Sequence, residues 1–264
     1  GAWVDVSCRS ICSERRLGSY EYTVIEQVLE SSTMPLAAQL NAACQCIWVD
    51  RAKLRDQLRA NLGDAASLLE ARAGLVAGSV VFLAPGEATA MDRTVRLITL
   101  ALSSGPFQQQ IARNAPELAR RPQANAGGIL GFDFHLGGPT PQLIEINTNP
   151  GGLLVSLELA RAATAGCDCF TEPVSVLAAA GVAIGQLGRR ISDSFLAEWT
   201  SVRGEAPLRS IAIVDDEPQS QYLYPEFLLY QRLLERAGWR VVIADATSLE
   251  LRDDAVFLAE ERID

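Results

Sequence analysis

Two short strand-like segments around a turn constrain the fold of this 264-residue chain more than any other feature. Residues 128–135 (GILGFDFH) and 142–147 (QLIEIN) combine apolar and polar positions in the way that strands do. The turn-forming cluster 137–141 (GGPTP) lies between them. This order predicts an antiparallel β-hairpin.

Alternation of side chains divides the expected hairpin into two faces. If Pro139 is the centre of the turn, Asp133 lies opposite Glu145, and Asn147 shares their face. The other face then carries the apolar side chains Phe132, Phe134, Ile144 and Ile146, with Phe134 opposite Ile144 and Phe132 opposite Ile146. His135 would face Leu143 and is expected to be packed or hydrogen-bonded rather than catalytic.

The polar face predicts a cation site. Directly opposed carboxylates lie about 4.5–5.5 Å apart at Cβ and repel one another, and a divalent cation turns this repulsion into binding. Magnesium prefers carboxylate and carbonyl oxygens and shares itself with substrate phosphates. The structural alternative is a solvated hairpin face on which an Asp and a Glu happen to be paired.

The next residues, 148–152 (TNPGG), lead into a helix expected from about Leu153, and such a helix N-terminus favours an anionic group.

Segments 132–134 (FDF) and 143–151 (LIEINTNPG) together resemble the metal-binding end of ATP-grasp enzymes, such as D-alanine–D-alanine ligase and glutathione synthetase. In that family an acid on one strand and a Glu-x-Asn on the next hold two magnesium ions on ATP. The resemblance implies that the metal ligands are Asp133, Glu145 and Asn147. It also implies that Asn149 and Gly151, in the loop that follows, serve catalysis by seating the acceptor substrate.

The sequence departs from the family in its phosphate-binding residues and in the order of its domains along the chain. ATP-grasp enzymes use lysines on an earlier lid, whereas the single lysine here, Lys53, lies in a helical segment without a glycine-rich loop. Arg113, Arg120 and Arg121 precede the hairpin and are the candidates for binding ATP. An α/β segment normally precedes the ATP-grasp core but here follows it. We therefore expect a circularly permuted protein, truncated at its C-terminus before its lysine-bearing lid and weak or inactive alone.

The expected fold class is α+β: an ATP-grasp-like half with an antiparallel sheet and helices, then the start of a Rossmann-like α/β domain. The expected divisions are 1–33 as a leader or an artificial addition, 34–202 as the ATP-grasp-like half, 203–209 as a linker and 210–264 as an incomplete α/β domain. In the first part of the chain the expected elements are two helices within 34–69, a strand over 78–84 ended by a turn at Pro85-Gly86, and helices over 90–103, 153–163 and 173–199. After the linker we expect a strand over 210–214, a helix over 224–237 and a strand over 240–244. Residues 255–264 are expected to be the approach to a further strand.

Charge, hydropathy and cysteine spacing limit which partners the protein can bind and in which compartment we expect it. The chain has 23 basic and 32 acidic residues, and its net charge of −9 argues against the binding of nucleic acid. No window reaches the roughly 20 apolar residues that cross a bilayer, and no secretory signal is evident, so we expect a cytoplasmic protein that does not bind membranes. The six cysteines have spacings unlike those of zinc sites, and reduced thiols are the expectation.

The function expected from these observations is that of a magnesium-dependent ligase. ATP would phosphorylate a small-molecule carboxylate, and an amine would attack the acyl phosphate. One alternative comes from residues 211–218 (IAIVDDEP), which resemble the start of a response-regulator receiver domain, where Asp215 and Asp216 would bind magnesium. In the structural reading of this segment, these acids end a strand and cap a helix. The remaining alternative is a non-catalytic relic, and the sequence does not indicate an oligomeric state.

Overall fold

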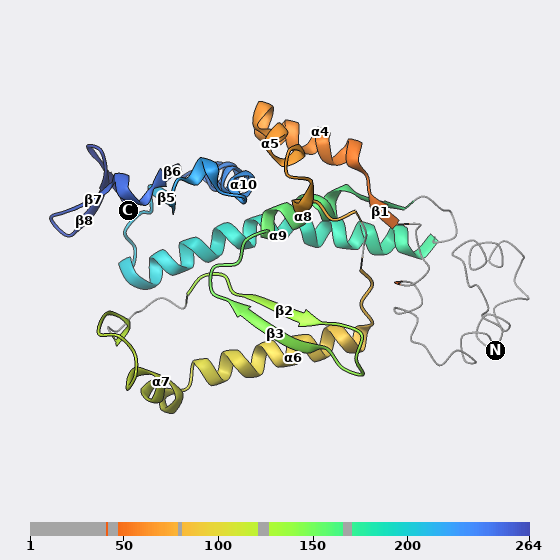
Figure 1. Cartoon of the computed structure of the whole chain (residues 1–264), viewed down its shortest axis with the longest axis horizontal. Coiled ribbons are helices and arrows are strands. Elements are labelled where there is room, and N and C mark those ends of the chain that lie inside the picture. The colour runs from red at the N-terminus through yellow and green to blue at the C-terminus, as the bar shows by residue number, and fades with distance from the viewer. Residues whose placement is uncertain (1–40, 42–46, 79–80, 121–126, 166–170) are drawn as a thin grey trace, which may run out of the picture. The chain divides into compact units, whose positions relative to one another are not determined.

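The computed structural model mixes helices with small sheets, in agreement with the α+β class (Figure 1). The structure describes residues 41, 47–78, 81–120, 127–165 and 171–264. Contacts between Cα atoms divide the chain into two compact units, residues 1–45 with 81–149 and residues 46–80 with 150–264. All six cysteines, and the segment expected to be a leader, lie outside the described residues.

In its described residues, the first unit contains the expected hairpin and two helices. Strand β2 (Gly131–His135) pairs with β3 (Gln142–Asn147) in antiparallel fashion, which confirms the hairpin. The helices are α6 (Pro85–Leu102) and α7 (Gly105–Ala112), followed by a 3-10 turn, η3 (Leu118–Arg120). The turn expected at Pro85-Gly86 is wrong, because Pro85 begins α6. Proline suits the first position of a helix, where its missing N–H has no intrahelical partner to lose.

The strand expected over residues 78–84 is also wrong for its described part. Residues 81–84 form neither strand nor helix. The Asn41 side chain takes the place of a neighbouring strand, since its amide accepts from Phe82 N–H at 2.7 Å and donates to Phe82 C=O at 2.8 Å. The backbone groups of Phe82 are therefore satisfied without a β-ladder.

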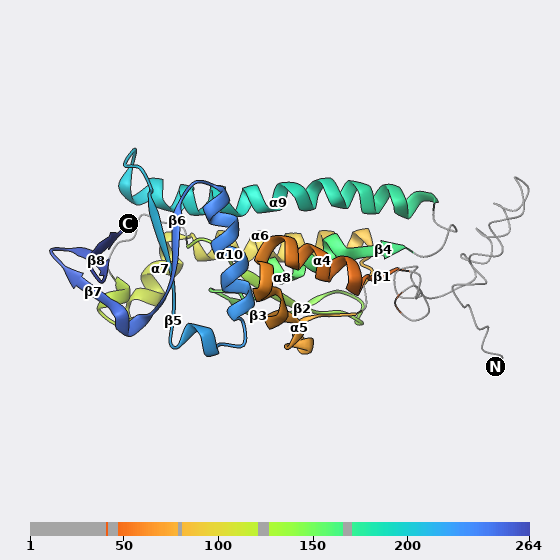
Figure 2. The ribbon, with the colours of Figure 1, turned by 90° about the horizontal axis from the view of Figure 1, so that it is seen from above.

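The second unit is built on helices that pack around leucines. Its helices are α4 (Arg51–Leu62), α5 (Ala66–Glu70), α8 (Leu153–Ala162), α9 (Thr171–Arg203) and α10 (Tyr224–Arg236), with 3-10 turns η1 (Gly63–Ala65), η2 (Ala73–Leu75), η4 (Pro218–Ser220) and η5 (Ala246–Ser248). Helices α4, α8 and α10 contact one another (Figure 2). Leu58, Leu69 and Leu234 are among the most deeply buried side chains there. The helices expected over 153–163 and 173–199 are confirmed, the latter as a single helix.

Helix α4 follows directly from its sequence. Leu54, Leu58 and Leu62 recur every four residues and are all buried, as a core-facing helical stripe requires. Asp50 caps the helix, because its carboxylate accepts from the N–H groups of Ala52 and Lys53 at 2.9 and 3.0 Å.

The residues just before α4 differ from the expectation. A helix was expected to include Ile47, but β1 (Ile47–Val49) is a strand that pairs with β4 (Ala163–Ala165). A three-residue segment has no periodicity of its own, so its distant partner decides its state.

The strand–helix–strand unit is confirmed. Strands β5 (Ser210–Asp215) and β6 (Arg240–Asp245) are parallel, and α10 connects them and packs on β6. The chain then forms an antiparallel meander of β7 (Leu249–Arg252), β8 (Ala255–Leu258) and β9 (Glu261–Ile263). The Asp264 carboxylate joins this meander to β5 by accepting from the N–H groups of Arg209 and Ser210 at 2.8 and 3.1 Å.

The segment expected to be a linker lies between α9, which ends at Arg203, and β5, which begins at Ser210. Residues 150–202 and 210–264 nevertheless belong to the same compact unit, and a domain boundary at 203–209 stays a prediction. Among the described helices, none is both long and apolar enough to cross a bilayer.

Candidate metal and phosphate site

The hairpin brings together the three predicted metal ligands. Asp133 is the direct cross-strand partner of Glu145, as the position of the turn predicted. The Nδ2 atom of Asn147 lies 3.3 Å from Asp133 Oδ2 and 3.2 Å from Glu145 Oε1. The two carboxylates therefore lie on one side of the hairpin, within reach of a single shared atom.

The electrostatics of this cluster favour a hard cation. Asp133 and Glu145 are exposed, and the Asn147 amide, which is half-buried, donates to both of them and offsets their repulsion. A flip of the amide would exchange its two N–H donors for an oxygen. Two carboxylates and one amide oxygen are ligands that fit Mg²⁺ rather than zinc, with water and phosphate oxygens filling the remaining positions.

A β-bulge directly follows the acidic pair. Beyond it Phe134 pairs with Leu143 and His135 pairs with Gln142, so the expected pairs Phe134–Ile144 and His135–Leu143 are wrong. Ile144 is the extra residue on β3, and its side chain is 64% exposed. A bulge bends its strand and increases the local twist. The expected alternation of side chains between the two faces therefore holds only for the end of the hairpin that carries Asp133 and Glu145.

The apolar face of the hairpin is covered in part. Phe132 and Phe134 are half-buried, whereas Ile144 and Ile146 are exposed. The expectation that all four side chains face a core is thus wrong for the two isoleucines.

The loop after the hairpin enters α8 through two glycines. Gly152 is the N-cap residue and has a φ of 89°, in the left-handed region that favours glycine. A Cβ at Gly151 would collide with Leu223 Cδ1, so a larger residue here would require the Leu223 side chain to shift. Asn149 is exposed. The catalytic roles of Asn149 and Gly151 stay predictions.

The anion expected at the N-terminus of α8 is a carboxylate of the chain itself. Glu226, in the first turn of α10, accepts from Leu154 N–H at 2.9 Å and from Val155 N–H at 3.4 Å. Its side chain is buried, with 2% of the residue exposed. Burial raises the pKa of Glu226, while hydrogen bonds from the backbone at the start of α8 act in the opposite direction.

Sequence reasoning did not find Glu226. The run Tyr224-Pro225-Glu226 has the appearance of an ordinary helix start, where an acid stabilises the dipole of its own helix. Its partner, Leu154, is 72 residues away, and no spacing rule connects the two positions.

The structure describes two of the three predicted phosphate-binding arginines. Arg113 is the C-cap residue of α7 and is exposed. Arg120 is exposed and donates from Nε to the Ala115 carbonyl, five residues earlier, at 2.8 Å. Arg121 lies outside the described residues. Lys53 is exposed on α4, and the binding of ATP by the three arginines stays a prediction.

The acids of the α/β segment close turns. Asp215 and Asp245 end the parallel strands side by side, and Asp215 accepts from Asp216 N–H at 2.8 Å. Asp245 accepts from the hydroxyl and the N–H of Thr247 and from the N–H of Glu217, and these bonds lower the pKa of Asp245. Asp215 ends β5, as the structural reading of this segment expected, but neither Asp215 nor Asp216 caps the helical turn that follows: the N-cap of η4 is Glu217, whose side chain makes no capping bond. The receiver hypothesis stays a prediction.

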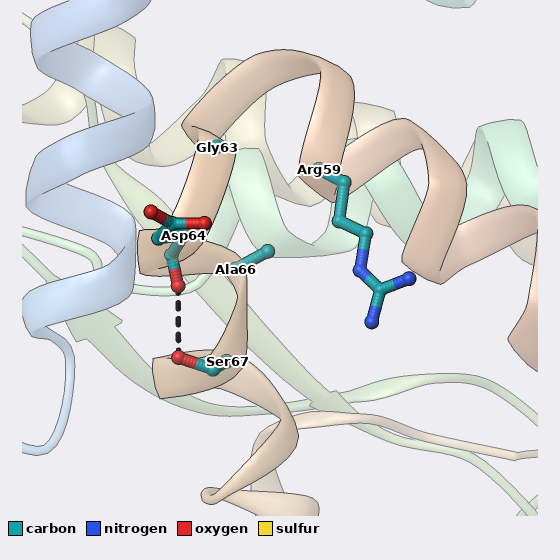
Figure 3. A pocket seen from close by; sticks show the side chains of 5 residues that line it. All are labelled: Arg59, Gly63, Asp64, Ala66 and Ser67. Atoms are coloured by element: carbon teal, nitrogen blue, oxygen red, sulfur yellow. Dashed lines mark hydrogen bonds between the residues drawn. The ribbon is translucent and has the colours of Figure 1, made fainter.

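A separate cavity lies at the junction of α4 and α5 (Figure 3). Its volume is about 430 Å³, and its lining residues are Arg59, Gly63, Asp64, Ala66 and Ser67. The Ser67 hydroxyl donates to the Asp64 carbonyl at 2.8 Å, which is an ordinary local bond. None of the predicted site residues lines this cavity.

Within the described part of the chain, no three His, Cys, Asp or Glu side chains gather into a group that would hold a metal. The hairpin set differs because its third member is an amide, so substrate oxygens and water would complete the coordination of an ion. Comparisons of the chain with protein-family models, with curated proteins and with solved structures gave no match.

Proposed function

We propose that this chain is the metal- and nucleotide-binding half of an ATP-dependent carboxylate–amine ligase of the ATP-grasp type. Asp133, Glu145 and Asn147 would hold Mg²⁺ on the phosphates of ATP. The observation that supports this is the shared contact of one amide nitrogen with both carboxylates, at 3.3 and 3.2 Å, on a single face of the hairpin.

The reaction would proceed in two transfers. A substrate carboxylate oxygen attacks the γ-phosphorus of ATP, ADP leaves and an acyl phosphate forms. The amine then attacks the acyl carbon, inorganic phosphate leaves and the amine proton passes to solvent. Bound Mg²⁺ would neutralise the charge that builds up on the phosphate oxygens.

The protein would contribute mainly position and charge. Phosphoryl transfer needs little covalent chemistry from side chains, so ligands fixed on paired strands suit the task. The exposure of Asp133 and Glu145 leaves room for a ligand as large as ATP. Arg113, Arg120 and Arg121 are proposed to bind ATP phosphates, and Asn149 and Gly151 to seat the acceptor.

Metal binding gives the first test. Titration of the full chain with Mn²⁺, followed by electron paramagnetic resonance in the presence of ATP, should show binding in the unmodified protein. The substitutions Glu145→Gln and Asn147→Ala should each weaken it about tenfold or more, since each removes a ligand oxygen or its charge. Glu117→Gln is the matched control, because it removes an exposed acid from the same unit and should change nothing. Equal Mn²⁺ affinity in the Glu145→Gln and control proteins would contradict the proposal.

Turnover gives the second test. Release of ADP is measured with a panel of carboxylates, with hydroxylamine as a general amine that traps an acyl phosphate as a hydroxamate. Hydroxamate formation should require Mg²⁺ and should disappear in Glu145→Gln while the circular dichroism spectrum stays unchanged. Binding of Mg²⁺-ATP without hydroxamate from any carboxylate would favour the non-catalytic alternative.

A further inference from the structure

The N-terminus of α8 depends on a side chain from a distant helix. Leu154 N–H and Val155 N–H donate to the carboxylate of Glu226, which is almost fully buried. The first N–H groups of a helix have no intrahelical acceptors and usually rely on the N-cap side chain. The N-cap residue here is Gly152, which has no side chain to offer.

The start of α10 also holds the turn that precedes α8, at Pro150–Gly152, by a second contact. Leu223, three residues before Glu226, packs so closely on Gly151 that a Cβ there would collide with it. Glu226 and Leu223 therefore hold the turn at Pro150–Gly152 and the start of α8 by two kinds of contact, Glu226 through hydrogen bonds and Leu223 through packing. Both belong to the start of α10 or to the residue before it.

We infer that Glu226 is a positioning residue: as an internal anion at the N-terminus of α8, it sets the conformation of the Pro150–Gly152 turn. In its functional part this inference rests on the proposed ligase activity, in which that turn seats the acceptor. The metal ligands lie on the preceding strands, in the other compact unit. Loss of the carboxylate should therefore affect the acceptor and leave metal binding unchanged.

The chemistry of the cap suggests a rescue experiment. Glu226→Ala removes both acceptor oxygens and leaves the N–H groups of Leu154 and Val155 buried without partners. The deleted side chain leaves room for a small carboxylate, so formate should occupy the vacated position and accept from the same groups. Glu235→Ala is the matched control, since Glu235 lies on the same helix, is partly exposed and pairs with Arg232 at 3.3 Å.

Amide hydrogen exchange of the full chain tests the cap without reference to activity. In Glu226→Ala, the amides of Leu154 and Val155 should exchange about tenfold faster than in the unmodified protein, and formate should slow them again. Chloride at the same ionic strength should have no such effect, and Glu235→Ala should respond to neither salt. Unchanged exchange in Glu226→Ala, or equal effects of formate and chloride, would overturn the inference. If Glu226→Ala does not fold, Glu226→Gln replaces it, and loss of one acceptor oxygen should still speed exchange.

Kinetics test the positioning role. Glu226→Gln should raise the KM for hydroxylamine severalfold while Mn²⁺ affinity stays within about twofold of the unmodified protein. Intact Mn²⁺ binding with an unchanged KM would overturn the positioning role. Absence of Mn²⁺ binding in the unmodified protein would instead contradict the proposed ligase, and hydrogen exchange would still decide whether Glu226 fixes the turn.

Discussion

At the scale of single residues, the buried carboxylate of Glu226 gives the protein a specific pH dependence. Burial raises the pKa of Glu226 above its ordinary 4.5. The folded protein therefore holds this proton more tightly than the unfolded chain does. The stabilisation that protonated Glu226 gives the folded protein is fully present below about pH 4.5. It is lost as the pH rises through the pKa of Glu226 in the folded protein.

The substitution Glu226→Gln removes this titration. The free energy of unfolding of the unmodified protein, relative to that of Glu226→Gln, should fall as the pH rises above about 4.5. Tyr230 does not interfere, because burial and the charge of Glu226 raise its pKa to about 12. Urea unfolding of both proteins over a pH series measures the difference, and a constant difference would contradict the expectation.

Gly151 makes a second prediction at this scale. Gly151→Ala should destabilise the protein by about 1–3 kcal/mol, because the new methyl group collides with Leu223. Adding Leu223→Ala should relieve the collision, so the two changes should be less harmful together than their separate effects predict. Gly86→Ala in α6 is the control, since nothing lies within 4 Å of its Cβ position. Chemical denaturation of the single and double variants decides the matter.

At the scale of elements, the N-cap of α4 is the clearest local determinant. Asp50→Ala should lower the free energy of unfolding by about 1 kcal/mol, because the N–H groups of Ala52 and Lys53 lose their acceptor. Asp50→Asn keeps an acceptor oxygen and should retain most of the stability. An equal loss in both variants, measured by urea unfolding, would show that the charge matters rather than the hydrogen bonds.

Elements whose own residues carry their signal were predictable from the sequence. Helix α4 has a leucine every fourth position, and β3 has the bounds that its composition indicated. The failures are short segments whose state depends on a distant partner. The strand at Ile47–Val49 exists because β4 lies beside it, and Phe82 is satisfied by the amide of Asn41.

The same distinction holds within the candidate site. The pairing of Asp133 with Glu145 followed from the position of the turn, since register and alternation are local properties. The bulge at Ile144 did not follow, because alternation assumes equal residue counts on the two strands. Glu226 was inaccessible for a stronger reason, since its role depends on the packing of α10 against α8.

At the scale of the whole molecule, the core of the second unit joins segments on both sides of residues 203–209. Leu229 and Leu234 of α10 are buried in the same unit as Leu58 of α4 and Val155 of α8. A chain that ends at Arg203 should therefore lose cooperative unfolding of α4 and α8, because these helices lose a packing partner and the Glu226 cap. Hydrogen exchange of the shortened chain measures this, and full protection of α4 would contradict it.

The dependence of α8 on Glu226 also has a consequence for how the protein is made. Synthesis proceeds from the N-terminus, so Leu154 leaves the ribosome 72 residues ahead of the carboxylate that completes its helix. Until that carboxylate emerges, the N–H groups of Leu154 and Val155 lack the acceptor that they have in the folded protein. The segment assigned to the acceptor substrate therefore cannot reach its final form before Glu226 has been synthesised.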